Sequence, residues 1–92
     1  MTESDLKIET DRVRVTEWRL PPGDQTGYHK HEYDYVVGPL TGGELTIEDA
    51  GGNNIKFATT MGAAYARPEG VEHNVRNLSE QEIRFTEIEL LG

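Results

Sequence analysis

The residues of this chain whose types and spacing could do chemistry are its three histidines. His29 and His31 are two positions apart, and residues i and i+2 of an extended strand project from the same face. His73 follows a tight turn framed by Pro68 and Gly70. Three neutral imidazoles on one divalent transition metal leave coordination positions open to water, substrate or dioxygen. The spacing therefore predicts an open metal site, the alternative being that the histidines are ordinary core or surface groups.

The stretches around these histidines resemble the two signature motifs of the cupin superfamily. The first lies within residues 23–42 and reads Gly23-x5-His29-x-His31-x3-Tyr35-x6-Gly42. The second lies within residues 62–77 and reads Gly62-x5-Pro68-x-Gly70-x2-His73-x3-Asn77. The second matches the family pattern at every fixed position, whereas the first has Tyr35 where cupins usually carry a glutamate ligand. The resemblance implies a small single-domain cupin with a three-histidine metal site. Residues 18–23 and 29–40 also look like short bacterial cupins linked to β-alanine breakdown.

The elements that must position these residues are predicted to be strands. No helical periodicity runs through ten residues without a Gly or Pro, while period-2 alternation recurs along the chain. Residues 1–92 are expected to form one all-β domain, a small β-barrel of the jelly-roll kind, which in cupins is a double-stranded β-helix. The expected strands are 12–20, 28–31, 33–37, 44–48, 54–59, 63–67, 72–77 and 81–91. In the first strand the apolar residues occupy odd-numbered positions at the start and even-numbered positions at the end. This parity switch predicts a bulge near Thr16 or Glu17, and a similar switch in the last strand predicts that both strands bend.

Several side chains are candidate neighbours of the metal. Strand parity from His31 places Tyr33 and Tyr35 on the histidine face, and Glu32 and Asp34 on the opposite face. Tyr35 is our candidate catalytic residue, as a hydrogen-bond donor or weak ligand, with an ordinary packed aromatic as the alternative. The candidate substrate-binding residues are Tyr33, Arg67 and Asn77. Arg67 could hold a carboxylate through its guanidinium fork, or be a solvated surface charge.

Composition limits the partners. Seventeen acidic and nine basic residues give a net charge of -8, which repels nucleic acid and anionic membrane surfaces, so we expect neither as a partner. Residues 1–11 contain no apolar run of the length a signal peptide needs, and a cytoplasmic location is the expectation. A 92-residue barrel with a cavity buries a small core, so we expect a homodimer.

The function expected from these features is that of a metal-binding cupin. We expect one divalent transition metal per chain, Fe, Ni, Mn, Cu or Zn, in a mononuclear enzyme with dioxygenase-like or Lewis-acid chemistry. Without a carboxylate ligand the ion keeps its +2 charge, which favours a small anionic organic molecule. Three-histidine cupins include thiol and diketone dioxygenases, and the resemblance points the same way. The alternatives are a non-catalytic small-molecule-binding or sensor module and a structural oligomer with a vestigial site.

Overall fold

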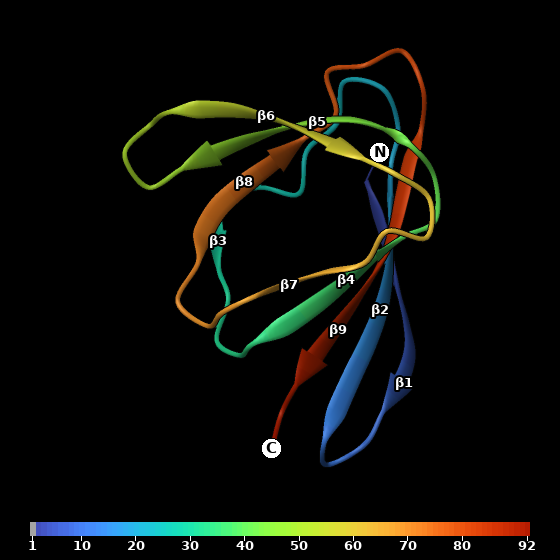
Figure 1. The fold of residues 1–92 in the computed structure, drawn as a ribbon, viewed down its shortest axis with the longest axis vertical. Helices are drawn as coiled ribbons and strands as arrows, with labels where there is room; N and C mark the ends of the chain where they lie inside the picture. The colour runs from blue at the N-terminus through green and yellow to red at the C-terminus, as the bar shows by residue number, and fades with distance from the viewer. Residues whose placement is uncertain (1) are drawn as a thin grey trace.

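The computed structural model describes residues 2–92, which form two antiparallel sheets facing each other (Figure 1). The strands are β1 (Glu3–Glu9), β2 (Val13–Leu20), β3 (His29–Lys30), β4 (Tyr35–Pro39), β5 (Gly43–Asp49), β6 (Asn54–Thr59), β7 (Tyr65–Arg67), β8 (Glu72–Arg76) and β9 (Ile83–Leu90). One sheet has the order β1-β2-β9-β4-β7 and the other β3-β8-β5-β6. The predicted all-β fold is confirmed. Within residues 2–92 no helix is long and apolar enough to cross a membrane.

Strand β1 is the one element that the sequence did not predict. Its apolar residues, Leu6 and Ile8, are both exposed, so it has no buried face to produce a strong alternating pattern. The strand forms along the edge of β2, and ion pairs reinforce the pairing. The Arg19 guanidinium donates to Glu3 at 2.8 Å and to Asp5 at 2.9 Å. Charged side chains on an edge strand also discourage pairing with another sheet.

The bulge predicted near Thr16 or Glu17 of β2 is wrong. Pairing of β2 with β9 runs without interruption, and the register shift lies instead in β1, between Leu6 and Ile8. The parity switch has another cause, because the apolar side chains change face along β2. Trp18 belongs to the inner face, whereas residues nearer the start of the strand place their apolar side chains on the outer face.

That outer face carries an apolar row across the whole five-stranded sheet. Opposed residues of antiparallel strands share a face, so the register brings together Ile8, Val15, Ile88, Val36 and Ala66. Ile8 is 53% exposed. The five-stranded sheet therefore carries apolar side chains on its outer face as well as on the inner face that forms the core.

The core lies between the sheets, and its buried residues are Leu20, Tyr35, Val37, Leu45, Val75, Ile83 and Phe85. Asn77, a predicted substrate-binding residue, lies at the edge of this core and is completely buried. Its side-chain amide donates to the carbonyls of Leu20 and Gln81, both at 2.7 Å, and accepts from the Ser79 hydroxyl at 2.6 Å. Asn77 thus joins the end of β2 to the connection between β8 and β9.

We predict that Asn77→Ala lowers the free energy of unfolding by about 2–4 kcal/mol, because the buried Leu20 carbonyl loses its side-chain donor and the fully buried Asn77 side chain leaves a gap. Chemical denaturation followed by circular dichroism measures this. Asn54→Ala, at an exposed position of β6, is the matched control and should change stability little. Equal effects of the two substitutions would contradict the structural role of Asn77.

The apolar outer row leads us to expect a homodimer, in which a second copy covers it. Ile8→Glu should then give a monomer at micromolar concentration with an unchanged circular dichroism spectrum, because a charge would be buried in the contact. Light scattering measures the mass. Leu78→Glu, which changes an exposed residue of the β8–β9 connection, is the control. A monomeric unmodified protein would refute the expectation.

Candidate metal centre

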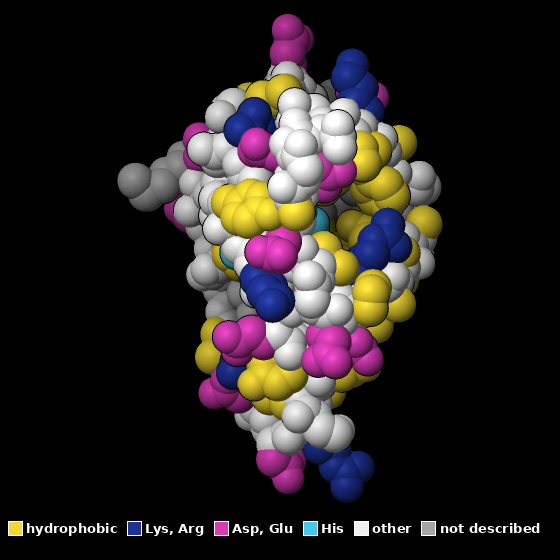
Figure 2. Space-filling model, turned by 90° about the vertical axis from the view of Figure 1, so that its left-hand side faces the viewer, with side chains coloured by type: hydrophobic (Ala, Val, Ile, Leu, Met, Phe, Trp, Pro, Cys, Tyr) yellow, Lys and Arg dark blue, Asp and Glu magenta, His cyan; other side chains and the backbone are white. Residues whose placement is uncertain are grey.

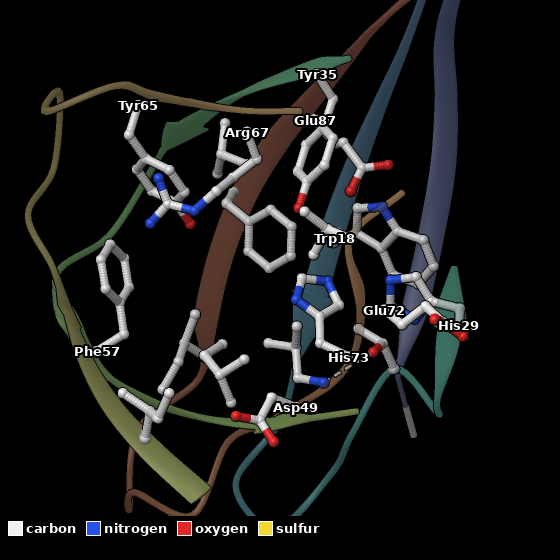
Figure 3. Close-up of a pocket in the computed structure, with 18 residues that line it drawn as sticks. Trp18, His29, Tyr35, Asp49, Phe57, Tyr65, Arg67, Glu72, His73 and Glu87 are labelled. Carbon is white, nitrogen blue, oxygen red and sulfur yellow. Dashed lines mark hydrogen bonds between the residues drawn. The ribbon is translucent and has the colours of Figure 1, made fainter. Parts of the chain in front are cut away.

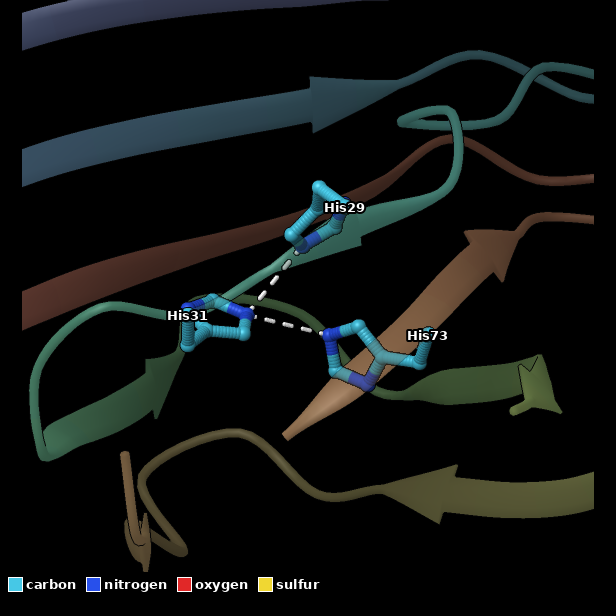
Figure 4. A group of neighbouring side chains, drawn as sticks. All are labelled: His29, His31 and His73. Atoms are coloured by element: carbon cyan, nitrogen blue, oxygen red, sulfur yellow. Dashed lines mark hydrogen bonds between the residues drawn. The ribbon is translucent and has the colours of Figure 1, made fainter. Parts of the chain in front are cut away.

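The three histidines converge from two pieces of chain held together by the β3–β8 pairing (Figure 4). His29 of β3 lies directly opposite His73 of β8. His31 follows β3 by one residue, and its backbone N–H donates to the Val71 carbonyl at 2.9 Å. Its own carbonyl accepts from the N–H of Gly70 at 2.8 Å, so the predicted turn before His73 is tied to His31. The predicted cluster of His29, His31 and His73 is therefore present.

The spacing of the imidazole nitrogens fits a shared ion. His31 Nε2 lies 3.1 Å from His29 Nε2 and 3.1 Å from His73 Nε2. A neutral imidazole nitrogen carries at most one hydrogen, so His31 cannot donate a full hydrogen bond to both neighbours. Two nitrogens each about 2.1 Å from one ion, at roughly a right angle, would be about 3 Å apart. The three side chains could therefore hold a metal ion, as their ligand atoms all lie within 4.8 Å of one another.

A backbone carbonyl orients His29 for this task. His29 Nδ1 donates to the Gly27 carbonyl at 2.7 Å, which leaves the Nε2 lone pair directed at the cluster. Asn74, a buried residue of β8, holds Gly27 in turn, since its side-chain oxygen accepts from the Gly27 N–H at 3.0 Å. Sequence reasoning did not identify this support of His29, because nothing in the sequence distinguishes Asn74 from other polar residues.

Burial keeps two of the imidazoles in the neutral form that metals require. It lowers the pKa of His31 to about 4, with His29 and His73 as further causes. Burial also lowers the pKa of His73 to about 4, followed by the effects of His29 and of the Arg67 guanidinium. Protons therefore do not compete for these nitrogens near neutral pH.

Tyr35 packs against the cluster rather than joining it. Its ring stacks on His31 with a centroid distance of 3.8 Å and an interplanar angle of 17°. Burial, with Glu87 as the next cause, raises the pKa of Tyr35 to about 12, so the phenol keeps its proton. Among residues 2–92 no aspartate or glutamate completes the histidine cluster. The catalytic role assigned to Tyr35 from the sequence stays a prediction.

A cavity of about 300 Å³ opens beside His29 and His73 (Figure 3). Most of its wall is apolar or aromatic, and the residues include Val37, Leu45, Ile47, Phe57, Val75 and Phe85. In Figure 2 a hollow on one face of the molecule is bordered by hydrophobic side chains and shows histidine inside it. A mostly apolar wall with a few polar groups is typical of a small-molecule site.

Arg67 is the basic side chain on the wall of this cavity. In β4–β7 pairing Arg67 lies opposite Tyr35, so both side chains belong to the inner face. The guanidinium lies 4.7 Å from the centre of the Tyr65 ring and 5.8 Å from that of Phe57. Its hydrogen bond goes to a backbone carbonyl, and within residues 2–92 it has no ion pair. Among the described residues, no ion pair therefore neutralises the charge of Arg67.

A second cavity of about 320 Å³ meets the cluster from another side. His31 and Tyr33 line this one, and His73 lines the first. The residues shared by the two cavities are Trp18, Thr26, His29 and Glu87. The histidine cluster thus lies where the two cavities meet.

Two of these shared residues, Trp18 and Glu87, were not identified from the sequence as polar groups of the site. The indole Nε1 of Trp18 is buried and has no hydrogen-bond partner within residues 2–92. Burial, with Glu89 as a second cause, raises the pKa of Glu87 to about 7. Period-2 alternation places Glu87 on the inner face with Phe85, and that signal could have identified it.

Of the predicted substrate-binding residues, two line a cavity and one does not. Tyr33 and Arg67 reach a cavity, as expected for substrate-binding residues, although their role stays a prediction. Asn77 lines neither cavity, and its side-chain amide instead donates hydrogen bonds to the backbone carbonyls of Leu20 and Gln81. Glu32 and Asp34 are exposed, in agreement with the parity argument.

Known proteins are similar to this chain over nearly its whole length. It is 46% identical over 85 residues to the β-alanine degradation protein BauB of Pseudomonas aeruginosa, covering 92% of this chain and 88% of that protein. The crystal structure of a cupin domain from Bordetella pertussis is 49% identical, with a TM-score of 0.93, and the match covers 97% of this chain and 92% of the other.

A more distant structure shares the fold alone. The polyketide cyclase RemF of Streptomyces resistomycificus is 23% identical, with a TM-score of 0.77, and the match covers 99% of this chain and 66% of the other. The family model described as a cupin domain matches residues 16–89. This chain therefore belongs to the cupin family.

Proposed function

We propose that this protein is a mononuclear metalloenzyme that binds a small organic acid between the metal and Arg67. The observation that carries the proposal is the meeting of a three-histidine cluster and a guanidinium without an ion pair at one mostly apolar cavity. His29, His31 and His73 would hold one divalent transition metal. Such an ion supplies Lewis-acid polarisation of a bound oxygen, or activation of dioxygen when it is redox-active.

Electrostatics support an anionic ligand. Neutral histidines would leave the ion its full charge, since no carboxylate among residues 2–92 joins the cluster. The Arg67 guanidinium also lowers the pKa of His73, after burial and His29, so its positive charge acts at the cluster. The name of the Pseudomonas aeruginosa relative adds a link to β-alanine, itself a short carboxylic acid.

The enzymatic part is tested by loading the protein with iron(II) and measuring oxygen consumption with small oxo-acids, hydroxy-acids and diketones. In parallel, the zinc-loaded protein is tested for hydrolysis or isomerisation of the same compounds by NMR. Turnover that requires the metal supports the enzyme. Binding of acids without any turnover would favour a sensor or binding module instead.

We predict one transition metal per chain, and a loss of affinity of more than about 100-fold in His31→Ala and His73→Ala. Asn74→Ala should cost less, about 10-fold, because it acts on His29 only through Gly27. Metal titration followed by elemental analysis measures this series. Lys30→Ala, an exposed residue between two of the ligands, should bind metal normally. Metal retention by both histidine variants would place the site elsewhere.

Arg67→Gln should weaken oxalate binding to the zinc-loaded protein about 10-fold, since a charge-assisted hydrogen bond is lost. Zinc affinity should stay the same or rise, because a positive charge near His73 is removed. Calorimetry measures both. Arg76→Gln is the control, since Arg76 pairs with Glu48 at 2.9 Å and lines neither cavity. Unchanged oxalate affinity in Arg67→Gln would remove Arg67 from the site.

A further inference from the structure

Glu87 occupies a wall position that reaches both cavities beside the histidine cluster. In the register of the five-stranded sheet it lies opposite Thr16 of β2 and Val37 of β4, so its side chain belongs to the inner face. Within residues 2–92 no side chain forms a hydrogen bond or ion pair with its carboxyl group. Figure 3 shows that group directed into the space beside Trp18 and Tyr35.

Trp18 supplies an unused donor next to this carboxyl group. The register pairs Trp18 with Phe85 and Thr16 with Glu87, which makes Trp18 and Glu87 diagonal neighbours on adjacent strands. The indole N–H is buried without a partner, and a buried donor without a partner is costly unless a ligand or water satisfies it. A donor and a carboxyl group thus face the same ligand space.

We propose that Glu87 is the acid–base residue of this site, with the Trp18 N–H binding the ligand oxygen whose proton Glu87 exchanges. A weak acid bound here would give up the proton of its hydroxyl group, which a metal held by the three histidines would make more acidic. The O–H bond of the ligand breaks, and the proton forms an O–H bond on the Glu87 carboxylate. On release the proton returns, so no oxidant or reductant is needed. This inference rests on the proposed metal site.

The charged surroundings of Glu87 suit this role. On its own strand Glu89 is the nearest acidic group, and it disfavours the ionised form of Glu87. Arg14 of β2 lies opposite Glu89 and its guanidinium is 3.5 Å from that carboxylate. Tyr35 of β4 and Tyr65 of β7 share the inner face with Glu87, whose charge raises the pKa of each phenol.

A positively charged group and an ionisable group also line the cavities that Glu87 reaches. Arg67 of β7 shares the first cavity with Glu87, and His29 of β3 shares both cavities. Because burial raises the pKa of Glu87 to about 7, the carboxyl group can both accept and return a proton near neutral pH.

The test uses acetohydroxamic acid, a weak acid that chelates metals through two oxygens and keeps its hydroxyl proton in neutral solution. Calorimetry of its binding to the zinc-loaded protein, in buffers of different ionisation enthalpy, counts the protons released. At pH 8 we expect well under one proton released per bound probe, because the anionic oxygen of the probe beside Glu87 raises the pKa of that carboxyl group further and Glu87 keeps the proton. At pH 5.5, where Glu87 is already protonated, release should approach one.

Glu87→Gln should release close to one proton at both pH values, since the acceptor is gone. Glu72→Gln, which removes an exposed carboxylate from the wall of the same cavity, should behave like the unmodified protein. Trp18→Phe should weaken probe binding several-fold and leave the proton count unchanged. A purely structural role of Glu87 would alter stability without altering the proton count.

The proposal is overturned if the unmodified protein releases one proton at pH 8, or if Glu87→Gln gives the same count as the unmodified protein. Either result would leave the metal site standing, because zinc and probe would still bind. Failure to retain zinc would instead remove the metal site itself, and the acid–base role with it. The unmodified protein alone decides the point if the Glu87→Gln variant does not fold.

Discussion

The pairing of the two-residue strand β3 with β8 is the constraint on which the site depends. It places His29 opposite His73, and the hydrogen bonds of the His31 backbone to Val71 and Gly70 extend the contact past the end of β3. Together with the hydrogen bonds of Thr26 and Gly27 to β8, this pairing joins the two histidine-bearing segments of the chain. Because β3 is so short, the turn before His73 has to supply hydrogen bonds that a longer strand would have provided.

The five-stranded sheet then supplies the rest of the site from its inner face. Tyr35 lies opposite Arg67 on β7 and opposite Glu89 on β9, and the next row contains Glu87. Residues of this face are apolar near Leu20 and polar toward the cluster. One sheet therefore provides both the packed core and the polar wall of the cavity, and the change between them occurs within single strands.

The sequence predicted the histidine cluster and most strands because both depend on local spacing. Two histidines at i and i+2 and a turn before the third are visible without knowledge of strand pairing. Strand β1 was missed because its stability comes from pairing with β2 and from ion pairs, not from a buried face. The bulge was misplaced because a change of apolar face and a bulge leave the same parity switch.

The less predictable part of the site depends on contacts between distant segments. Asn74 orients His29 only through Gly27. Asn77 forms a hydrogen bond with the distant Leu20 carbonyl, and no local sequence pattern predicts that contact. Glu87 lay on the correct face by alternation, yet its importance comes from burial beside Trp18, which requires the register of β2 and β9.

Trp18 has one more consequence, because it is the only tryptophan in the chain. Its indole lies on the wall that both cavities share with His29. Tryptophan fluorescence, excited at wavelengths that the four tyrosines do not absorb, therefore originates entirely beside the histidine cluster. A paramagnetic ion or a ligand held there would change the emission, so the protein carries its own optical reporter of site occupancy and needs no attached dye.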